Sequence, residues 1–316
     1  MDLQKYKSGL FILTVLLAIN SCNTTPQKIM DETPTRGTIN IGVDDSYKLL
    51  ADAELYTFHS FYKDAHISAQ YLSQDSILKL YLKDSVRLII TSRKLTENEE
   101  AYLKEKSIFP RTTKIAYDAL AFILNRENTD TLIRYNSIKD IFTGKTSKWQ
   151  QLNPKSKLND IKIVFDNPGS NNVSLIMNKF GLSGSLPKYC YSVTKNSEVI
   201  SYVEKHPEAM GIISVNWISD PSDSISHAFL KKVRVASISS EYDSYGSDFY
   251  RPHPGYIANK SYPFIREVYM ISRETFYGLG SGFIQFVAGD QGQRIILKEG
   301  MVPATMPVRL VQISKN

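Results

Sequence analysis

The chain has 316 residues, of which 42% are hydrophobic and 22% are charged, a composition typical of a globular protein rather than a disordered one. Its formal net charge of +6 is mild, and the basic residues form no run of the kind that binds nucleic acid. The length suits two ordinary domains, and we expect no nucleic-acid partner.

The N-terminal segment predicts export. Two lysines precede a largely apolar run of eleven residues, Gly9–Ile19. A membrane span needs about 20 apolar residues, so this run is too short to span but suits a secretory signal. Cys22 follows a small residue at the end of the run, which resembles the bacterial lipobox, although the polar Asn20 departs from it. We expect removal of residues 1–21, acylation of Cys22 and an anchored protein in the periplasm; the alternative is an ordinary signal peptide that happens to carry a cysteine.

The rest of the chain alternates between strand and helix patterns. Residues 22–36 are polar, contain two prolines and predict a tether. Strands are expected at 38–43, 67–72, 86–91, 119–124, 161–165, 210–215 and 263–271. Helices are expected at 49–61, 76–82, 96–106, 137–142, 173–180, 199–206 and 283–298, with Gly278–Gly282 as a flexible entry to the last one. This alternation predicts an α/β architecture with a largely parallel sheet.

Five stretches in this order resemble a known family. They are Asp84–Leu95, Ile115–Asn125, Ser137–Lys145 with the following Trp149, His206–Ser214 and Phe283–Pro303. With these five stretches in this order, the sequence is similar to the phosphate-type substrate-binding proteins of ABC transporters, which have the type II periplasmic-binding fold. The likeness covers residues from about Gly37 to Pro303.

The resemblance implies a fold and a function. The fold would be α/β, with two doubly wound lobes joined by two hinge strands: lobe 1 at 37–118 and 272–316, and lobe 2 at 119–271. The protein would be a monomer that captures phosphate in a cleft between the lobes and passes it to an ABC permease in the inner membrane. The alternative use of the same fold is an anion sensor or envelope-complex adaptor without a dedicated permease.

The loops that should hold the anion depart from the family pattern. The family's loop is typically Arg-x-x-Gly-Ser-Gly-Thr, and Asp166–Asn172 takes its place here. The central Gly-Ser pair matches, but Asp166 stands where the arginine would, and two asparagines replace Gly-Thr. Asp44–Ser46 and Ser73–Ser76 likewise replace glycine-rich turns. The resemblance therefore supports phosphate as the ligand less strongly than it supports the fold. Another oxyanion or a small carboxylate stays an alternative ligand.

Three loops follow predicted strands and open predicted helices, where a doubly wound lobe binds its ligands: Asp45–Ser46, Ser92–Arg93 and Ser170–Asn172. Helix N-termini offer free N–H groups to an anion. Arg93 would add a charged, forked donor, and Asp45, which only accepts hydrogen bonds when ionised, would favour protonated phosphate over sulfate. The residues expected to bind the ligand are Asp45, Ser46, Ser76, Ser92, Arg93, Gly169, Ser170, Asn171 and Asn172.

Each of these residues has a purely structural alternative. Ser46 and Ser170 are common types of helix N-cap. Arg93 can pair with Glu97 one helical turn away, and Asp166 can be a surface turn residue.

Enzyme chemistry finds no support in the sequence. The five histidines have no metal-ligand spacing, and no Gly-x-Ser-x-Gly motif is present. We therefore expect no catalytic residues, no metal and no cofactor.

Overall fold

The computed structural model describes residues 32–219, 224–243 and 247–308, which belong to one folded unit. The predicted signal peptide and Cys22 lie outside these residues. None of the helices in the described ranges has the length and apolar character needed to cross a membrane.

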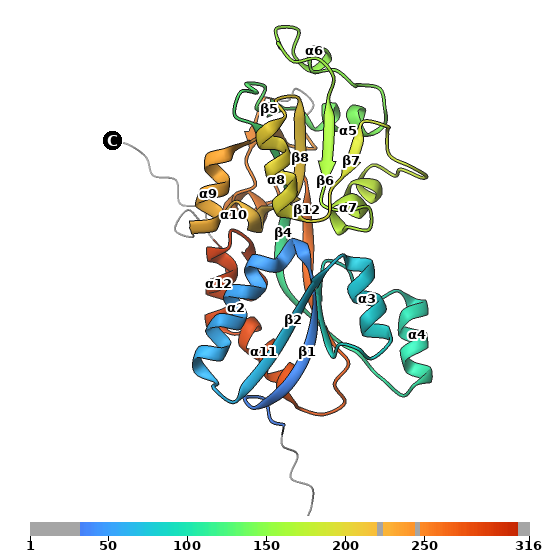
Figure 1. The fold of residues 1–316 in the computed structure, drawn as a ribbon, viewed down its shortest axis with the longest axis vertical. Helices are drawn as coiled ribbons and strands as arrows, with labels where there is room; N and C mark the ends of the chain where they lie inside the picture. The colour runs from blue at the N-terminus through green and yellow to red at the C-terminus, as the bar shows by residue number, and fades with distance from the viewer. Residues whose placement is uncertain (1–31, 220–223, 244–246, 309–316) are drawn as a thin grey trace, which may run out of the picture. The chain divides into compact units, whose positions relative to one another are not determined.

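The first lobe is built on β1 (Gly37–Asp44), which pairs in parallel with β2 (Ala65–Leu72) and β3 (Leu88–Thr91). Figure 1 shows these strands with their helices in the lower half of the view. The helices that follow the strands are α2 (Lys48–Phe61), α3 (Gln74–Leu82) and α4 (Glu97–Glu105). This alternation confirms the sequence pattern for the N-terminal third of the chain.

The second lobe is built on β6 (Lys162–Phe165), which lies in parallel between β7 (Cys190–Ser192) and β8 (Ala209–Ser214). Its helices are α5 (Tyr135–Phe142), α6 (Trp149–Leu152), α7 (Asn171–Lys179), α8 (Asn196–Lys205), α9 (Ser224–Lys232) and α10 (Pro254–Ala258). The remaining short strands are β5 (Leu132–Ile133), β9 (Val233–Val235), β10 (Ser237–Ser239) and β11 (Phe249–Tyr250). Sequence patterns predicted none of these four strands, because each is only two or three residues long.

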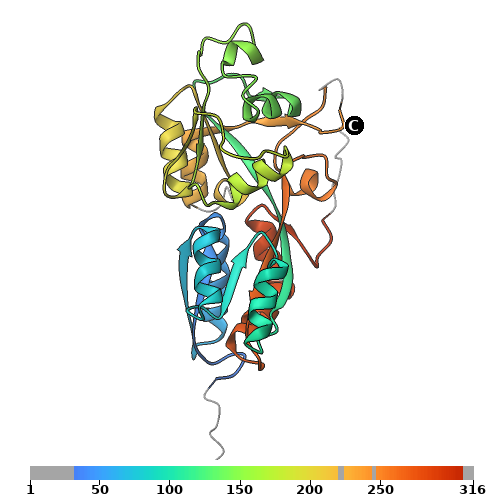
Figure 2. The same ribbon diagram turned by 90° about the vertical axis from the view of Figure 1, so that its right-hand side faces the viewer.

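Two antiparallel strands connect the lobes (Figure 2). They are β4 (Arg111–Asn125) and β12 (Ile265–Ser272). β4 pairs with β8 through its second half, so it belongs to both lobes. The sheet is therefore mixed around the hinge rather than largely parallel. The predicted lobe boundaries fall inside β4 and at the end of β12, and they stay a prediction.

The C-terminal region differs from the single closing helix expected at 283–298. Two helices are present, α11 (Leu279–Ala288) and α12 (Asp290–Lys298), followed by β13 (Val302–Pro303). Gly289 separates the helices in extended conformation, with φ −82° and ψ 176°.

The glycine-rich stretch before Phe283 is not a flexible entry either, because it forms the first turn of α11. The Glu274 carboxylate accepts hydrogen bonds from the N–H groups of Gly280 and Ser281 at 2.8 and 2.7 Å, which caps the helix. A Cβ atom on Gly282 would lie 1.8 Å from the carbonyl oxygen of Pro34. Close packing, rather than flexibility, requires that glycine.

Candidate functional site

The loop after β1 places acidic and hydroxyl side chains at the end of the first-lobe sheet. Asp44, Asp45 and Ser46 are all buried. Oδ1 of Asp44 accepts a hydrogen bond from the Ser46 N–H at 2.8 Å, which caps the short 3-10 helix that leads into α2. The Ser46 hydroxyl has no hydrogen-bond partner among the described residues. The loop therefore offers one unused hydroxyl where strand ends and helix begins.

The loop after β6 forms the matching part of the second lobe. Ser170 caps α7, because its Oγ accepts a hydrogen bond from the Val173 N–H at 3.3 Å. The side chains of Asn171 and Asn172 follow in the first turn and are buried. Asp166 at the start of this loop is also buried and accepts a hydrogen bond from Nδ2 of Asn172 at 3.1 Å. It is not a surface turn residue.

Asparagine side chains link the two lobes. Nδ2 of Asn171 donates to Oδ2 of Asp44 at 2.8 Å, and Oδ1 of Asn171 accepts from the Ser92 hydroxyl at 2.6 Å. Oδ2 of Asp45 accepts from the backbone N–H and from Nδ2 of Asn196, at 3.0 and 2.9 Å. The three predicted loops therefore meet, and Asn196 at the start of α8 is a contact that the sequence did not indicate.

A buried arginine stands at the centre of these contacts. Arg266 of β12 donates from Nε to Oδ2 of Asp118 on β4 at 2.8 Å, and its Nη2 lies 2.7 Å from the same oxygen. Its Nη1 donates to the side-chain oxygens of Asn171 and Asn172 at 2.5 and 2.8 Å. We use the name interlobe network for the set of Asp44, Asp45, Ser92, Asp118, Asp166, Asn171, Asn172, Asn196 and Arg266.

Sequence reasoning missed Arg266, although a signal was present. Asp118 interrupts an otherwise apolar strand run, and Arg266, followed by Glu267, interrupts another. Charged residues are rarely buried unless they are paired, so charges inside two predicted apolar strands are a signal for a buried ion pair.

Carboxyl groups outnumber the single guanidinium in the interlobe network, and burial raises the pKa of two of them, Asp44 and Asp166. Burial raises the pKa of Asp44, although hydrogen bonding from Asn171 and the charge of Arg266 oppose the shift. Burial and the neighbouring Asp44 raise the pKa of Asp166 to about 7. Burial lowers the pKa of Arg266, but Tyr47, Asp118 and Asp44 outweigh this effect and raise it overall. Near neutral pH the guanidinium is charged and Asp166 is partly protonated.

Two predicted ligand residues have other partners. Arg93 forms a two-armed ion pair with Glu99, at 2.8 and 2.7 Å, rather than with Glu97. Ser76 bonds to the Ser73 hydroxyl at 2.9 Å. Among the described residues neither side chain hydrogen-bonds to the interlobe network. Their ligand roles, like those of the other predicted residues, stay predictions.

Gly169 lies close to the first lobe. A Cβ atom built on it would be 3.2 Å from Oδ2 of Asp75, at the beginning of α3. A side chain at this position would therefore press against the opposite lobe.

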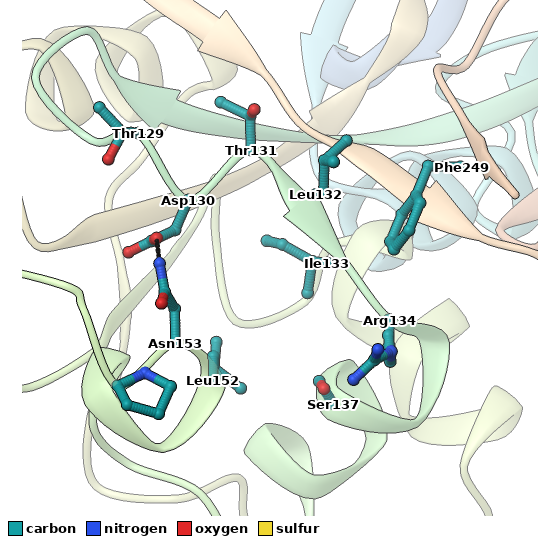
Figure 3. A pocket seen from close by; sticks show the side chains of 11 residues that line it. Thr129, Asp130, Thr131, Leu132, Ile133, Arg134, Ser137, Leu152, Asn153 and Phe249 are labelled. Atoms are coloured by element: carbon teal, nitrogen blue, oxygen red, sulfur yellow. Dashed lines mark hydrogen bonds between the residues drawn. The ribbon is translucent and has the colours of Figure 1, made fainter. Parts of the chain in front are cut away.

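A separate pocket, shown in Figure 3, lies on the second lobe. Its volume is about 410 Å³, and Leu132, Arg134, Asn153 and Phe249 are among the residues that line it. No member of the interlobe network lines this pocket. The loops that meet at the hinge, not this pocket, thus form the candidate site.

The sequence matches a known protein family over most of its length. Residues 31–291 match the family model of the PBP superfamily domain. The chain belongs to the PBP superfamily. The match covers both lobes and both hinge strands, which confirms the expected fold class.

Individual relatives are more distant. The phosphate-binding protein PstS of Staphylococcus epidermidis is 24% identical over 239 residues, which are 73% of this chain and 68% of the relative. PstS of Staphylococcus aureus is 24% identical over 240 residues, with the same coverage. These relatives are binding proteins, in agreement with the expectation that the chain is not an enzyme.

Solved structures support the same fold. A Clostridium perfringens protein solved with bound phosphate has a TM-score of 0.71 and 22% identity, and the match covers 85% of this chain and 100% of the other. An ABC-type phosphate transport receptor from Vibrio cholerae has a TM-score of 0.61 and 19% identity, with coverage of 84% and 100%. At these identities the likeness is one of fold.

Proposed function

We propose that the chain is a lipid-anchored periplasmic substrate-binding protein that captures phosphate, or a related oxyanion, between its two lobes for uptake by an ABC permease. The family match and the phosphate-binding relatives support this function. The likeness to phosphate-binding structures extends over both lobes.

The observation that carries the proposal is the convergence of three strand-end loops on one buried guanidinium. Arg266 would supply the positive charge in place of the arginine that the loop after β6 lacks, because its fork suits the geometry of an oxyanion. The hydroxyls of Ser46 and Ser92 would add neutral donors. In the structure Asn171 and Asn172 give Arg266 the oxygen atoms that an anion would otherwise provide.

Capture would then follow from hinge motion. Asn171 bonds across the lobes to Asp44 and Ser92, so opening the lobes at β4 and β12 would break these contacts and expose Arg266. An entering oxyanion would take the place of the Asn171 amide on the guanidinium.

Isothermal titration of the purified protein with phosphate, sulfate and molybdate tests this function. We expect phosphate to bind most tightly, because Asp45 and the other carboxyl groups favour an anion that can donate a proton. If sulfate or molybdate binds more tightly than phosphate, that anion is the ligand, and the proposed role in transport still holds.

The second candidate function, a sensor or envelope-complex adaptor, is favoured by a specific observation. The interlobe network holds more carboxyl groups than cations, and its Arg266 already has side-chain partners. Absence of heat with all three oxyanions, together with neighbouring genes that encode no permease, would favour the adaptor over the binding protein.

The anchor is tested separately. The Cys22→Ala variant is expected to lose palmitate labelling and to leave the membrane fraction. Retention of both the label and the membrane association would contradict acylation at Cys22.

A further inference from the structure

A second cavity, of about 520 Å³, lies against the hinge strands. β4 contributes Tyr117 to its wall, β12 contributes Ile265 and Glu267, and β13 contributes Val302. Its volume is in the range of small-molecule sites in proteins.

The register of the hinge strands separates this cavity from the interlobe network. Arg266 pairs with Asp118, whereas Glu267 pairs with Tyr117 in the next row. Because successive strand residues point to opposite faces, the side chains of Ile265 and Glu267 face away from the ion pair. The cavity and the interlobe network therefore use opposite faces of the same two strands, and only Arg266 contributes to both.

The deep wall of the cavity is apolar and closed to hydrogen bonding. Ile257, Pro263 and Val302 are buried. The buried Tyr262 hydroxyl is already used, because it donates to the Leu120 carbonyl oxygen at 2.6 Å. This end of the cavity suits a hydrocarbon or aromatic body.

Most charges at the cavity are already paired. Lys179 lies 2.5 Å from Glu241, and Glu267 lies 3.0 Å from Lys114. Lys260 is exposed and has no carboxylate within 4.0 Å among the described residues.

The position of Lys260 is also unusual. Its φ of 62° lies in the left-handed region after α10, where glycine or asparagine is the ordinary choice. Lys260 thus brings to the cavity an ammonium group that forms no ion pair within the described part of the chain.

We propose that this cavity is a second ligand site, which binds a small carboxylate with an apolar body. The carboxylate would pair with Lys260 at the exposed side. Tyr117 offers a further donor, since its hydroxyl oxygen accepts from Lys114 at 2.7 Å and its own proton has no acceptor among the described residues. The apolar body would pack against Ile257 and Val302. This site differs in chemistry from the interlobe network, whose named residues are all polar or charged.

Titration with octanoate, and with octan-1-ol as the uncharged match, tests the proposal on the purified protein. Lys260→Gln should weaken octanoate binding about three- to tenfold and leave octanol within twofold, as expected for one partly exposed charge pair. Ala258→Trp, at an exposed position on the cavity wall, should weaken both probes by filling the space. Lys83→Gln, an exposed lysine on the first lobe, should change neither.

Because these titrations contain no phosphate, their result does not depend on whether the interlobe network binds phosphate. Octanoate binding that is unaffected by both Lys260→Gln and Ala258→Trp would overturn the proposal, as would the absence of octanoate binding. Equal weakening of octanoate and octanol by Lys260→Gln would overturn the role of the charge.

Discussion

Arg266→Met is expected to destabilise the protein strongly. The variant leaves the Asp118 carboxyl, which is fully buried, without the guanidinium that lies 2.7 and 2.8 Å away. Loss of one partner of a buried ion pair costs about 3–5 kcal/mol. Asn171 and Asn172 also lose a charged donor to their side-chain oxygens, at roughly 1 kcal/mol each.

The double variant Arg266→Met with Asp118→Asn should regain most of this loss, because the unpaired charge is removed together with its partner. Denaturant unfolding of the wild type, both single variants and the double variant gives the coupling free energy between the two residues. We expect coupling of at least about 2 kcal/mol. Two results would refute the buried pair as a main support of the hinge. One is a loss of less than about 1 kcal/mol in the free energy of unfolding of Arg266→Met, and the other is a double variant whose loss equals the sum of the two single losses.

Three further variants test the buried acids. Burial and the nearby Glu299 raise the pKa of Glu54 from 4.5 to about 9, so the contribution of this side chain to stability is complete below pH 4.5 and is lost as the pH rises toward 9. Glu54→Gln should therefore raise the free energy of unfolding by about 3 kcal/mol at pH 7 and leave it unchanged at pH 4.5. An equal effect of the variant at both pH values would contradict this prediction. Because the pKa of Asp166 is about 7, the affinity for sulfate should fall about tenfold between pH 6 and pH 8. Asp166→Asn should abolish this dependence of sulfate affinity on pH. A wild-type affinity for sulfate that does not change with pH would contradict the role of Asp166. Asp45→Asn should narrow the preference for phosphate over sulfate, since an amide can donate to either anion; an unchanged preference in competitive titration would leave Asp45 only its contact with Asn196.

The sequence predicted the elements that have a local signature. Thr96 is an example, since it begins α4 with a capping box to Glu99, and a Thr-x-x-Glu pattern is visible in the sequence. The apolar pattern predicted only the C-terminal part of β4, residues 119–124. The polar residues at its beginning, such as Thr112 and Thr113, belong to the strand because they pair with β12, which is far away in the chain.

The candidate site was predictable in place but not in detail. The loops between strand ends and helix beginnings lie at the sheet edge that the sequence pattern predicted, because the order of strands and helices determines where such loops lie. The partners across the lobes depend on contacts between distant residues: Asn171 and Asp44 are 127 positions apart, and Arg266 and Asp118 are 148 apart. No local pattern specifies which residues pair across the lobes. Arg93 was expected as the charged group because of its position in the family-like stretch Asp84–Leu95.

Phosphate titration of the wild type alongside the Arg266→Met, Asp118→Asn double variant tests whether Arg266 holds the anion. We expect saturable phosphate binding by the wild type and a loss of at least about tenfold in affinity in the folded double variant, because one charge-assisted contact to the anion is removed. Equal affinity of the two proteins would contradict the role of Arg266, and absence of binding by the wild type would contradict phosphate capture itself.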